Sequence, residues 1–290
     1  MADRKPEDTR LKSTGTEGEP DPEVIRFIYR GNAVGVAGRI TRVDPLSGLD
    51  HVFPSHAVSA LAATGGRSEY DAGHPSCFKI TRPEPREMFY VGHAHSLATG
   101  AWDPQLKAWV TSVQCQVQDL HILGGKIAVE RLFVNIVKKH GPTSDAPTIT
   151  LSDDCNIAGL SLDGRPVTVK INVGPFREAP TMAGLRDRVK ADGELSRRIG
   201  WMELKPASAG IAASHIVESV SFPEGKPEDV EWDPKTPNRI VWRGVGKIYL
   251  GELLVTDVSR RLTMLRVQLG SPVAGDVSAG EVETNGHTLP

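Results

Sequence analysis

Two stretches of the chain alternate apolar and polar residues about a glycine, with the same spacing in both. The first is residues 117–129, V-Q-D-L-H-I-L-G-G-K-I-A-V, and the second is residues 157–169, I-A-G-L-S-L-D-G-R-P-V-T-V. In each copy aliphatic residues nest about the glycine, as Ile122 and Ile127 do around Gly124. Alternation with a period of two that nests about glycine is typical of two antiparallel strands, because glycine allows the positive φ of a tight turn. The pattern predicts two similar β-hairpins.

The turns and the bends of these hairpins are also predicted from the pattern. Gly124-Gly125 is expected to form a two-residue turn, whereas Pro166, close to Gly164, lacks an N–H and predicts a longer or bulged second loop. The apolar positions change parity near Asp119, and again near residue 131 on the other strand. We therefore expect a β-bulge and one bend running across both strands.

The rest of the chain predicts a mainly β fold with one helical insertion. Alternation extends over most of the chain, whereas residues 181–204 place apolar residues at helical spacing, with Thr181 as N-cap and an interruption near Asp192. Residues 56–63 are rich in alanine and predict one or two helical turns, and the proline-rich residues 223–238 predict an exposed loop. We expect an antiparallel β-sandwich or a short solenoid-like stack built on the two hairpins. Strands are predicted at residues 33–43, 77–80, 88–99, 107–122, 211–222, 239–242, 247–255 and 261–269.

The two ends of the chain differ in composition from the middle. Residues 1–22 and 273–290 are polar and poor in aliphatic residues, so they have little to bury and are predicted to be disordered tails. Residues 23–272 then form a single β-rich domain, for which a hydrophobic content of 39% is sufficient.

Charge and cysteine content narrow the function classes. A net charge of −2 gives no general attraction to nucleic acid or to anionic membranes, and no segment reaches the roughly 20 apolar residues that span a bilayer. The polar N-terminus does not resemble a secretion signal, which favours a cytoplasmic location. Cys77, Cys115 and Cys155 are odd in number and widely spaced, so neither a disulfide framework nor a zinc site is indicated. Cys115 is expected to be a small core residue.

Two histidines carry the most suggestive chemistry. His93 and His95 are separated by one residue on a predicted strand, so both side chains lie on the same face and could chelate a metal. A third ligand would have to come from His121, Asp153 or Asp154, and no spacing fixes it. A polar strand face is the favoured interpretation, and no cofactor is predicted.

Other candidate sites have stronger structural interpretations. Arg260, Arg261 and Arg266 could bind an anionic ligand, but we favour capping of strand ends or pairing with Glu252 and Asp257. The tryptophans are scattered and favour packing over a sugar-binding platform; they are Trp102, Trp109, Trp201, Trp232 and Trp242. The chain contains no nucleophile elbow of the form G-x-S-x-G, no G-x-G-x-x-G and no P-loop.

Residues 111–127, T-S-V-Q-C-Q-V-Q-D-L-H-I-L-G-G-K-I, and 156–167, N-I-A-G-L-S-L-D-G-R-P-V, resemble the bacterial choice-of-anchor P family. The resemblance is confined to hairpin motifs. It implies a secreted, surface-attached protein without catalytic residues to carry over. The chain departs from that pattern because no signal peptide or C-terminal anchor is recognised, and the C-terminal third has no counterpart.

These observations predict a non-catalytic structural or interaction protein that binds itself or another protein through sheet edges or faces. The first alternative is an enzyme or small-ligand binder with a pocket near His93 and His95. The second alternative is a carbohydrate-binding module.

Overall fold

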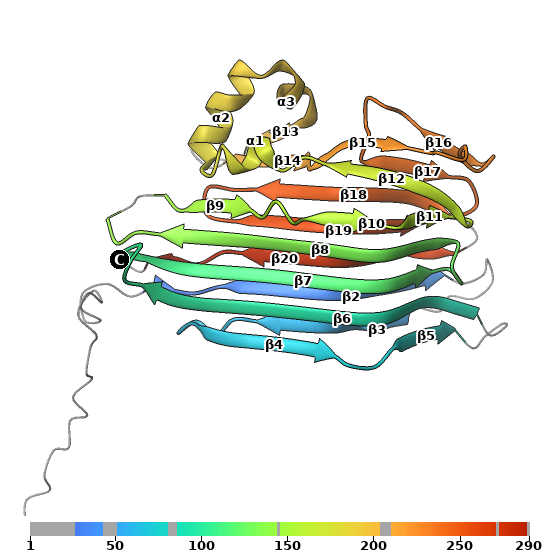
Figure 1. The fold of residues 1–290 in the computed structure, drawn as a ribbon, viewed down its shortest axis with the longest axis horizontal. Helices are drawn as coiled ribbons and strands as arrows, with labels where there is room; N and C mark the ends of the chain where they lie inside the picture. The colour runs from blue at the N-terminus through green and yellow to red at the C-terminus, as the bar shows by residue number, and fades with distance from the viewer. Residues whose placement is uncertain are drawn as a thin grey trace, which may run out of the picture.

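The structure is a computed structural model that describes residues 27–42, 51–80, 86–143, 146–203, 210–270 and 273–288. Two antiparallel sheets lie one behind the other in Figure 1, with a helical segment at one side. The predicted mainly β, antiparallel sandwich is therefore confirmed. None of the described helices is long and apolar enough to cross a membrane.

The front sheet has ten strands in the order β15-β12-β11-β8-β7-β6-β4, while β5 pairs with β6 and both β9 and β10 pair with β8. Its longest strands, β6 to β8, form a meander joined by short turns. The strands are β4 (Gly66–Ala72), β5 (Ser76–Ile80), β6 (Arg86–Asp103), β7 (Ala108–Ile122), β8 (Ile127–His140), β9 (Thr148–Leu151), β10 (Asn156–Ala158), β11 (Leu160–Leu162), β12 (Arg165–Ile171) and β15 (Val217–Ser221).

The back sheet has nine strands in the order β13-β14-β18-β19-β20-β2-β3, and β17 joins β16 to β18. A separate pair, β1 (Phe27–Ile28) with β21 (His287–Thr288), involves both ends of the described chain. The back-sheet strands are β2 (Gly31–Arg42), β3 (His51–Ala60), β13 (Gly200–Glu203), β14 (Gly210–His215), β16 (Val230–Trp232), β17 (Arg239–Trp242), β18 (Gly246–Val255), β19 (Arg260–Leu269) and β20 (Ala274–Thr284).

The core lies between the two sheets. Alternate side chains of β7, such as Val113, Cys115 and Val117, are fully buried and face the inner side of the back sheet, where β2 and β20 pack against β7. Burial of this apolar surface is the main favourable term in the folding free energy. The predicted core position of Cys115 is confirmed.

The two hairpins predicted from the sequence are β7–β8 and β11–β12, and they lie side by side because β11 pairs with β8. Both Leu123-Gly124 and Asp163-Gly164 have positive φ. The prediction of a longer second loop is wrong. Leu162 pairs directly with Arg165, which leaves a two-residue turn, and Pro166 lies one position further along the strand, where its missing N–H does not prevent closure. The predicted two-residue turn at Gly124-Gly125 is also wrong, because the first hairpin has a loop of four residues between Ile122 and Ile127.

The pairing of the strands is interrupted along one line of residues that crosses each sheet. Gln118 pairs with Arg131 and Leu120 with Val129, while the residues between them drop out of the pairing on both strands. The predicted β-bulge is wrong, because both strands lose one position and the register is kept, whereas a bulge adds a residue to one strand only. The interruption does lie where the apolar positions change parity. When the residues on this line are taken in the order in which their strands lie in each sheet, every second one has positive φ. The line consists of Ala57, Gly35, Gly280, Met264 and Gly251 in the back sheet and Gly92, Asp119, Glu130 and Gly159 in the front sheet.

The helical segment is shorter than predicted. It comprises α1 (Gly174–Arg177), α2 (Met182–Ala191) and α3 (Gly193–Arg198). Thr181 caps α2 as predicted, and Asp192 interrupts the helix because its side chain accepts the first N–H groups of α3. The chain continues into strand β13, and residue 204 lies outside the described residues. Buried Arg260 anchors the segment by donating to the carbonyl oxygens of Phe176 (2.8 Å) and Ala179 (2.5 Å).

Three other predictions of secondary structure need correction. Residues 56–63 do not form a helix; strand β3 ends at Ala60 because pairing with β2 overrides the helical preference of alanine. Residues 223–238 are not entirely loop, since they include β16. The predicted disordered tail at 273–290 is wrong over residues 273–288, because β20 is a central strand between β19 and β2. The predicted N-terminal tail, residues 1–22, lies outside the described residues.

The C-terminal segment is also held by a buried lysine. Lys138 on β8 is fully buried and donates to the carbonyl oxygens of Val258 and Gly286. Burial lowers the pKa of this amine to about 8. The contact ties the front sheet to the end of the chain that the sequence pattern had left unstructured.

Candidate functional site

The strands β3 and β4 end the back and front sheets on the same side of the sandwich, which we call the open side. Their nearest sheet neighbours are β2 and β6, and within the described residues no further strand pairs with either of them. Unpaired backbone groups of an edge strand are a template for another strand. The open side therefore offers two edges of different character.

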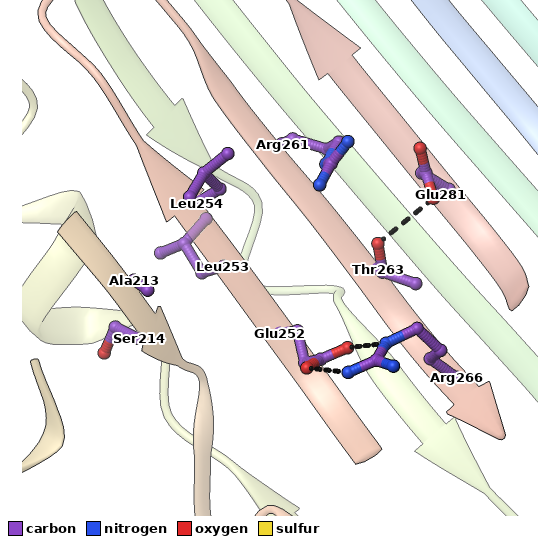
Figure 2. A pocket seen from close by; sticks show the side chains of 9 residues that line it. All are labelled: Ala213, Ser214, Glu252, Leu253, Leu254, Arg261, Thr263, Arg266 and Glu281. Carbon is purple, nitrogen blue, oxygen red and sulfur yellow. Dashed lines mark hydrogen bonds and ion pairs between the residues drawn. The ribbon is translucent and has the colours of Figure 1, made fainter. Parts of the chain in front are cut away.

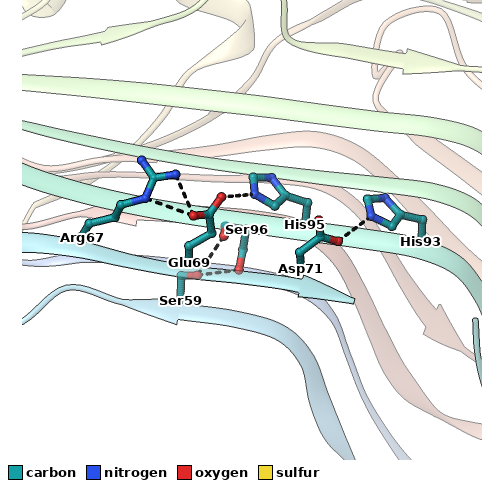
Figure 3. A network of polar contacts seen from close by, with 7 residues as sticks. All are labelled: Ser59, Arg67, Glu69, Asp71, His93, His95 and Ser96. Carbon is teal, nitrogen blue, oxygen red and sulfur yellow. Dashed lines mark hydrogen bonds and ion pairs between the residues drawn. The ribbon is translucent and has the colours of Figure 1, made fainter. Parts of the chain in front are cut away.

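The β4 edge is charged, and its charges are already paired. Figure 3 shows His93 and His95 of β6 directed toward the acidic side chains of β4. His93 lies 2.7 Å from a carboxylate oxygen of Asp71, and His95 lies 2.9 Å from one of Glu69. Arg67 donates to the other oxygen of Glu69, at 2.6 Å for its closer nitrogen. Hydrogen bonds from His95 first, and from Arg67, lower the pKa of the Glu69 carboxyl.

The two histidines share a face as the sequence predicts, but the candidate third ligands are elsewhere. Asp153 pairs with Arg177, and His121 pairs with Asp119. Across the described residues no three His, Cys, Asp or Glu side chains are arranged to hold a metal ion. The metal site at His93 and His95 stays a prediction without a third ligand.

The β3 edge is uncharged. Its ten residues, H-V-F-P-S-H-A-V-S-A, include no Asp, Glu, Lys or Arg. Val52 is 72% exposed and Val58 is 43% exposed, which makes them two of the few large apolar side chains left in solvent. Pro54 is consistent with an edge position, since proline is not tolerated in a central strand. This edge lacks the charged side chains that commonly prevent edge-to-edge pairing.

Aromatic side chains fill the space between the two edges. Phe53 of β3 and Phe78 of β5 lie 5.8 Å apart between ring centroids, and both contact buried Phe89. The ring centroids of His56 and Tyr70 lie 6.0 Å apart, and Tyr70 is 44% exposed. Nε2 of His56 lies 3.3 Å from the hydroxyl oxygen of Ser76. Burial lowers the pKa of His56.

A buried pair of hydroxyls joins the β3 edge to the front sheet. Ser59 donates to the carbonyl oxygen of Ser96 at 3.0 Å, and the two hydroxyl oxygens lie 2.7 Å apart (Figure 3). Both residues are fully buried. The position of β3 beside β4 is thus fixed by polar contacts as well as by the aromatic side chains.

A separate pocket of about 320 Å³ lies on the outer face of the back sheet, over β18, β19 and β20 (Figure 2). As predicted, Arg266 pairs with Glu252, through two hydrogen bonds of 2.7 Å. The prediction for Arg260 is wrong, since it neither caps a strand end nor pairs with an acid but donates to the carbonyl oxygens of Phe176 and Ala179 in the helical segment. For Arg261 the structure contains no ion pair with any described residue, although this side chain lines the pocket.

The family described as a domain of unknown function, DUF8256, matches residues 27–214. The chain belongs to this family. No curated protein matches it, and no solved structure does. The resemblance to the choice-of-anchor P family stays a prediction.

The DUF8256 match contains both edges of the open side, but it ends before most of the back sheet. β2 pairs with β20, which lies about 60 residues beyond the match, and β14 pairs with β18. Without β18 to β20, the strands β2 and β14 would lose their neighbours in the sheet. The folded unit of this DUF8256 member therefore extends to the end of the described chain.

The remaining candidates of the sequence do not gather into a site. Burial raises the pKa of the Cys115 thiol to about 12 and that of Cys155 to about 11, so neither is a ready nucleophile. Trp102 and Trp109 contact each other at 5.2 Å, but Trp109 is buried. The charge-free edge β3 was missed because its alanines and His56 were interpreted as helical; the only strand signal before them is the pair Val52-Phe53.

Proposed function

We propose that this protein is a non-catalytic interaction protein that self-associates by antiparallel pairing of the β3 strands of two copies. The observation that carries the proposal is the uncharged β3 edge with its two exposed valines. Main-chain hydrogen bonds would supply the attraction, and the valines would gain apolar burial.

A second copy is the favoured occupant because an antiparallel pair of identical strands has two-fold symmetry, the commonest symmetry of soluble oligomers. A strand without charged residues faces itself without like-charge repulsion. Val52 and Val58 lie three residues on either side of Ser55, so a pairing centred on Ser55 places each valine opposite the other valine of the second copy. By contrast, β4 pairing centred on its middle residue would place Glu69 against Glu69.

The enzymatic alternative near His93 and His95 receives no comparable support. Each imidazole already has a carboxylate partner, and the site has no third ligand among the described residues. Partner proteins other than a second copy would compete for the same β3 edge.

Light scattering over a range of protein concentrations tests this proposal. An interface built on one strand is small, so its affinity should be weak. We therefore expect the mass to rise toward that of two copies only as the protein concentration increases through the micromolar range. Val52→Lys/Val58→Lys should remain monomeric, because lysines on an edge oppose pairing. Leu106→Lys, at a residue in the β6–β7 turn that is 49% exposed, is the matched control and should associate normally.

A wild-type protein that stays monomeric up to about 1 mM, a weak affinity for any specific complex, would exclude self-association. Equal loss of association in the Leu106→Lys control would show that the β3 edge is not responsible. Circular dichroism of each variant confirms that the fold is retained.

A further inference from the structure

The pocket in Figure 2 holds a fixed set of polar groups and one unused cation. Glu252 orients Arg266 through two hydrogen bonds, and the Arg266 guanidinium also lies 4.1 Å from the centre of the Tyr249 ring. Thr263 on the pocket floor donates to Glu281 at 3.3 Å. These contacts hold three of the four charged side chains of the pocket before any ligand arrives.

Arg261 is the exception. It lies opposite Leu254 on β18 and opposite Glu283 on β20, yet no ion pair or hydrogen bond joins its guanidinium to any side chain in the described part of the chain. Its neighbour along the strand face is Thr263, whose partner is Glu281, so Arg261 and Glu281 are diagonal neighbours. Diagonal positions on adjacent strands lie about 7–8 Å apart. Among the described residues only Oε2 of Glu281 accepts a hydrogen bond, from Thr263.

Charge, size and the apolar wall together define the ligand class. The lining side chains include two arginines and two glutamates, and a zwitterion, which carries one charge of each sign, matches them better than an ion of a single sign. The unused guanidinium suits a carboxylate, and the second oxygen of Glu281 suits an ammonium group. Leu254 and Ala213 supply an aliphatic wall. The volume of about 320 Å³ is at the lower end for ligand pockets.

We propose that this pocket binds a free α-amino acid with an aliphatic side chain. Arg261 holds the carboxylate, Glu281 holds the ammonium group, and the side chain packs on Leu254. The pocket lies on the outer face over β18 to β20, and its groups take no part in the proposed pairing of β3. The binding is therefore independent of self-association.

Calorimetric titration of the full chain with L-leucine tests the proposal. We expect saturable binding in the millimolar range or tighter. Leucinamide, which lacks the carboxylate, and N-acetyl-leucine, which lacks the ammonium group, should each bind at least about tenfold more weakly, as expected for a lost charged hydrogen bond. Arg261→Gln should weaken leucine binding by a similar factor.

The matched control is Arg243→Gln, at an exposed arginine of the β17–β18 turn that pairs with Glu231 at 3.0 Å; it should bind leucine like the wild type. Absence of saturable binding up to about 10 mM leucine, or binding that Arg261→Gln leaves unchanged, overturns the site. Equal binding of N-acetyl-leucine and leucine overturns the amino-acid assignment. Arg261 is exposed, so its replacement leaves the fold intact, which a thermal melt verifies.

Discussion

The two edge strands of the open side, β3 and β4, differ in whether their side chains oppose the addition of another strand. β4 presents Arg67, Glu69 and Asp71 on its outer face; Glu69 and Asp71 pair with His95 and His93 of β6, and Arg67 pairs with Glu69. β3 presents two exposed valines and no charge. Both strands terminate a sheet, so the difference lies in their side chains alone. The comparison indicates that one edge of the sandwich is protected against strand addition and that the other is open to it.

The ion pairs of β4 contribute little to the free energy of folding. Exposed pairs gain modest Coulomb energy and are screened by salt. Their more important effect is on association, because a second strand placed beside β4 would bring its own groups against fixed charges. The role of the β4 charges is thus a matter of specificity more than of stability.

Among the changes considered, removal of the β4 charges should have the largest effect on self-association. In Arg67→Thr/Glu69→Thr/Asp71→Thr both edges of the open side become uncharged, so pairing can continue beyond two copies. We expect light scattering to show a mass that increases with concentration and does not level off at a dimer. A variant that behaves like the wild type would show that the β4 charges do not protect the edge.

A smaller effect, on the free energy of unfolding, is expected from removing the serine contact that holds β3 against the front sheet. Ser59→Ala removes two hydrogen bonds and leaves the buried Ser96 hydroxyl without its partner, which should lower the free energy of unfolding by about 1–2 kcal/mol. Urea denaturation measures the change. Ser55→Ala, at an exposed residue of the same strand, is the control and should unfold like the wild type. If the two variants were equally stable, the serine pair would not hold β3.

The smallest effect on self-association should come from protonation of His56. Burial lowers its pKa below 6.5, so its contribution to stability is present above pH 6.5 and is lost as the pH falls toward the lowered pKa. Protonation also adds a positive charge to β3. We expect the dimer dissociation constant to rise about fivefold at acidic pH, from about 1 kcal/mol of repulsion between two charges in water.

Sedimentation velocity from pH 7.5 down to the lowest pH at which the fold is retained measures this change, and His56→Gln should remove its pH dependence. The idea fails if His56→Gln and wild type respond alike to pH.

Local patterns predicted most of the front sheet. Alternation over β7 and β8 and the glycines at their turn specified a hairpin, because period-two burial requires only one covered face. The parity change near Asp119 correctly indicated an interruption of the pairing. The same reasoning failed at Pro166, because closure of a two-residue turn depends on which residues pair, and pairing is not visible in composition.

The wrong predictions concern places where parts of the chain that are distant in sequence come into contact. β20 has few large apolar residues and resembles a polar tail, yet it is central because β2 and β19 cover both of its edges. The second half of β3, from His56, was predicted to be helical because of its alanines. Local propensity is a weak prior, and pairing with β2 overrides it. The candidate ligands of His93 were chosen by residue type, whereas the actual partner, Asp71, lies on a strand 22 residues away.

The sequence by itself determined the antiparallel β character, the hairpins with their glycine turns, the capped helix at Thr181 and the Arg266–Glu252 pair. Each of these depends on residues that are near in sequence or strongly complementary in charge. The tertiary structure alone decided which strands became edges, that the C-terminal segment is central, and that Arg261 is left without a partner. An edge, a core strand and an unpaired charge are all defined by neighbours, and those neighbours come from strands far apart in the chain.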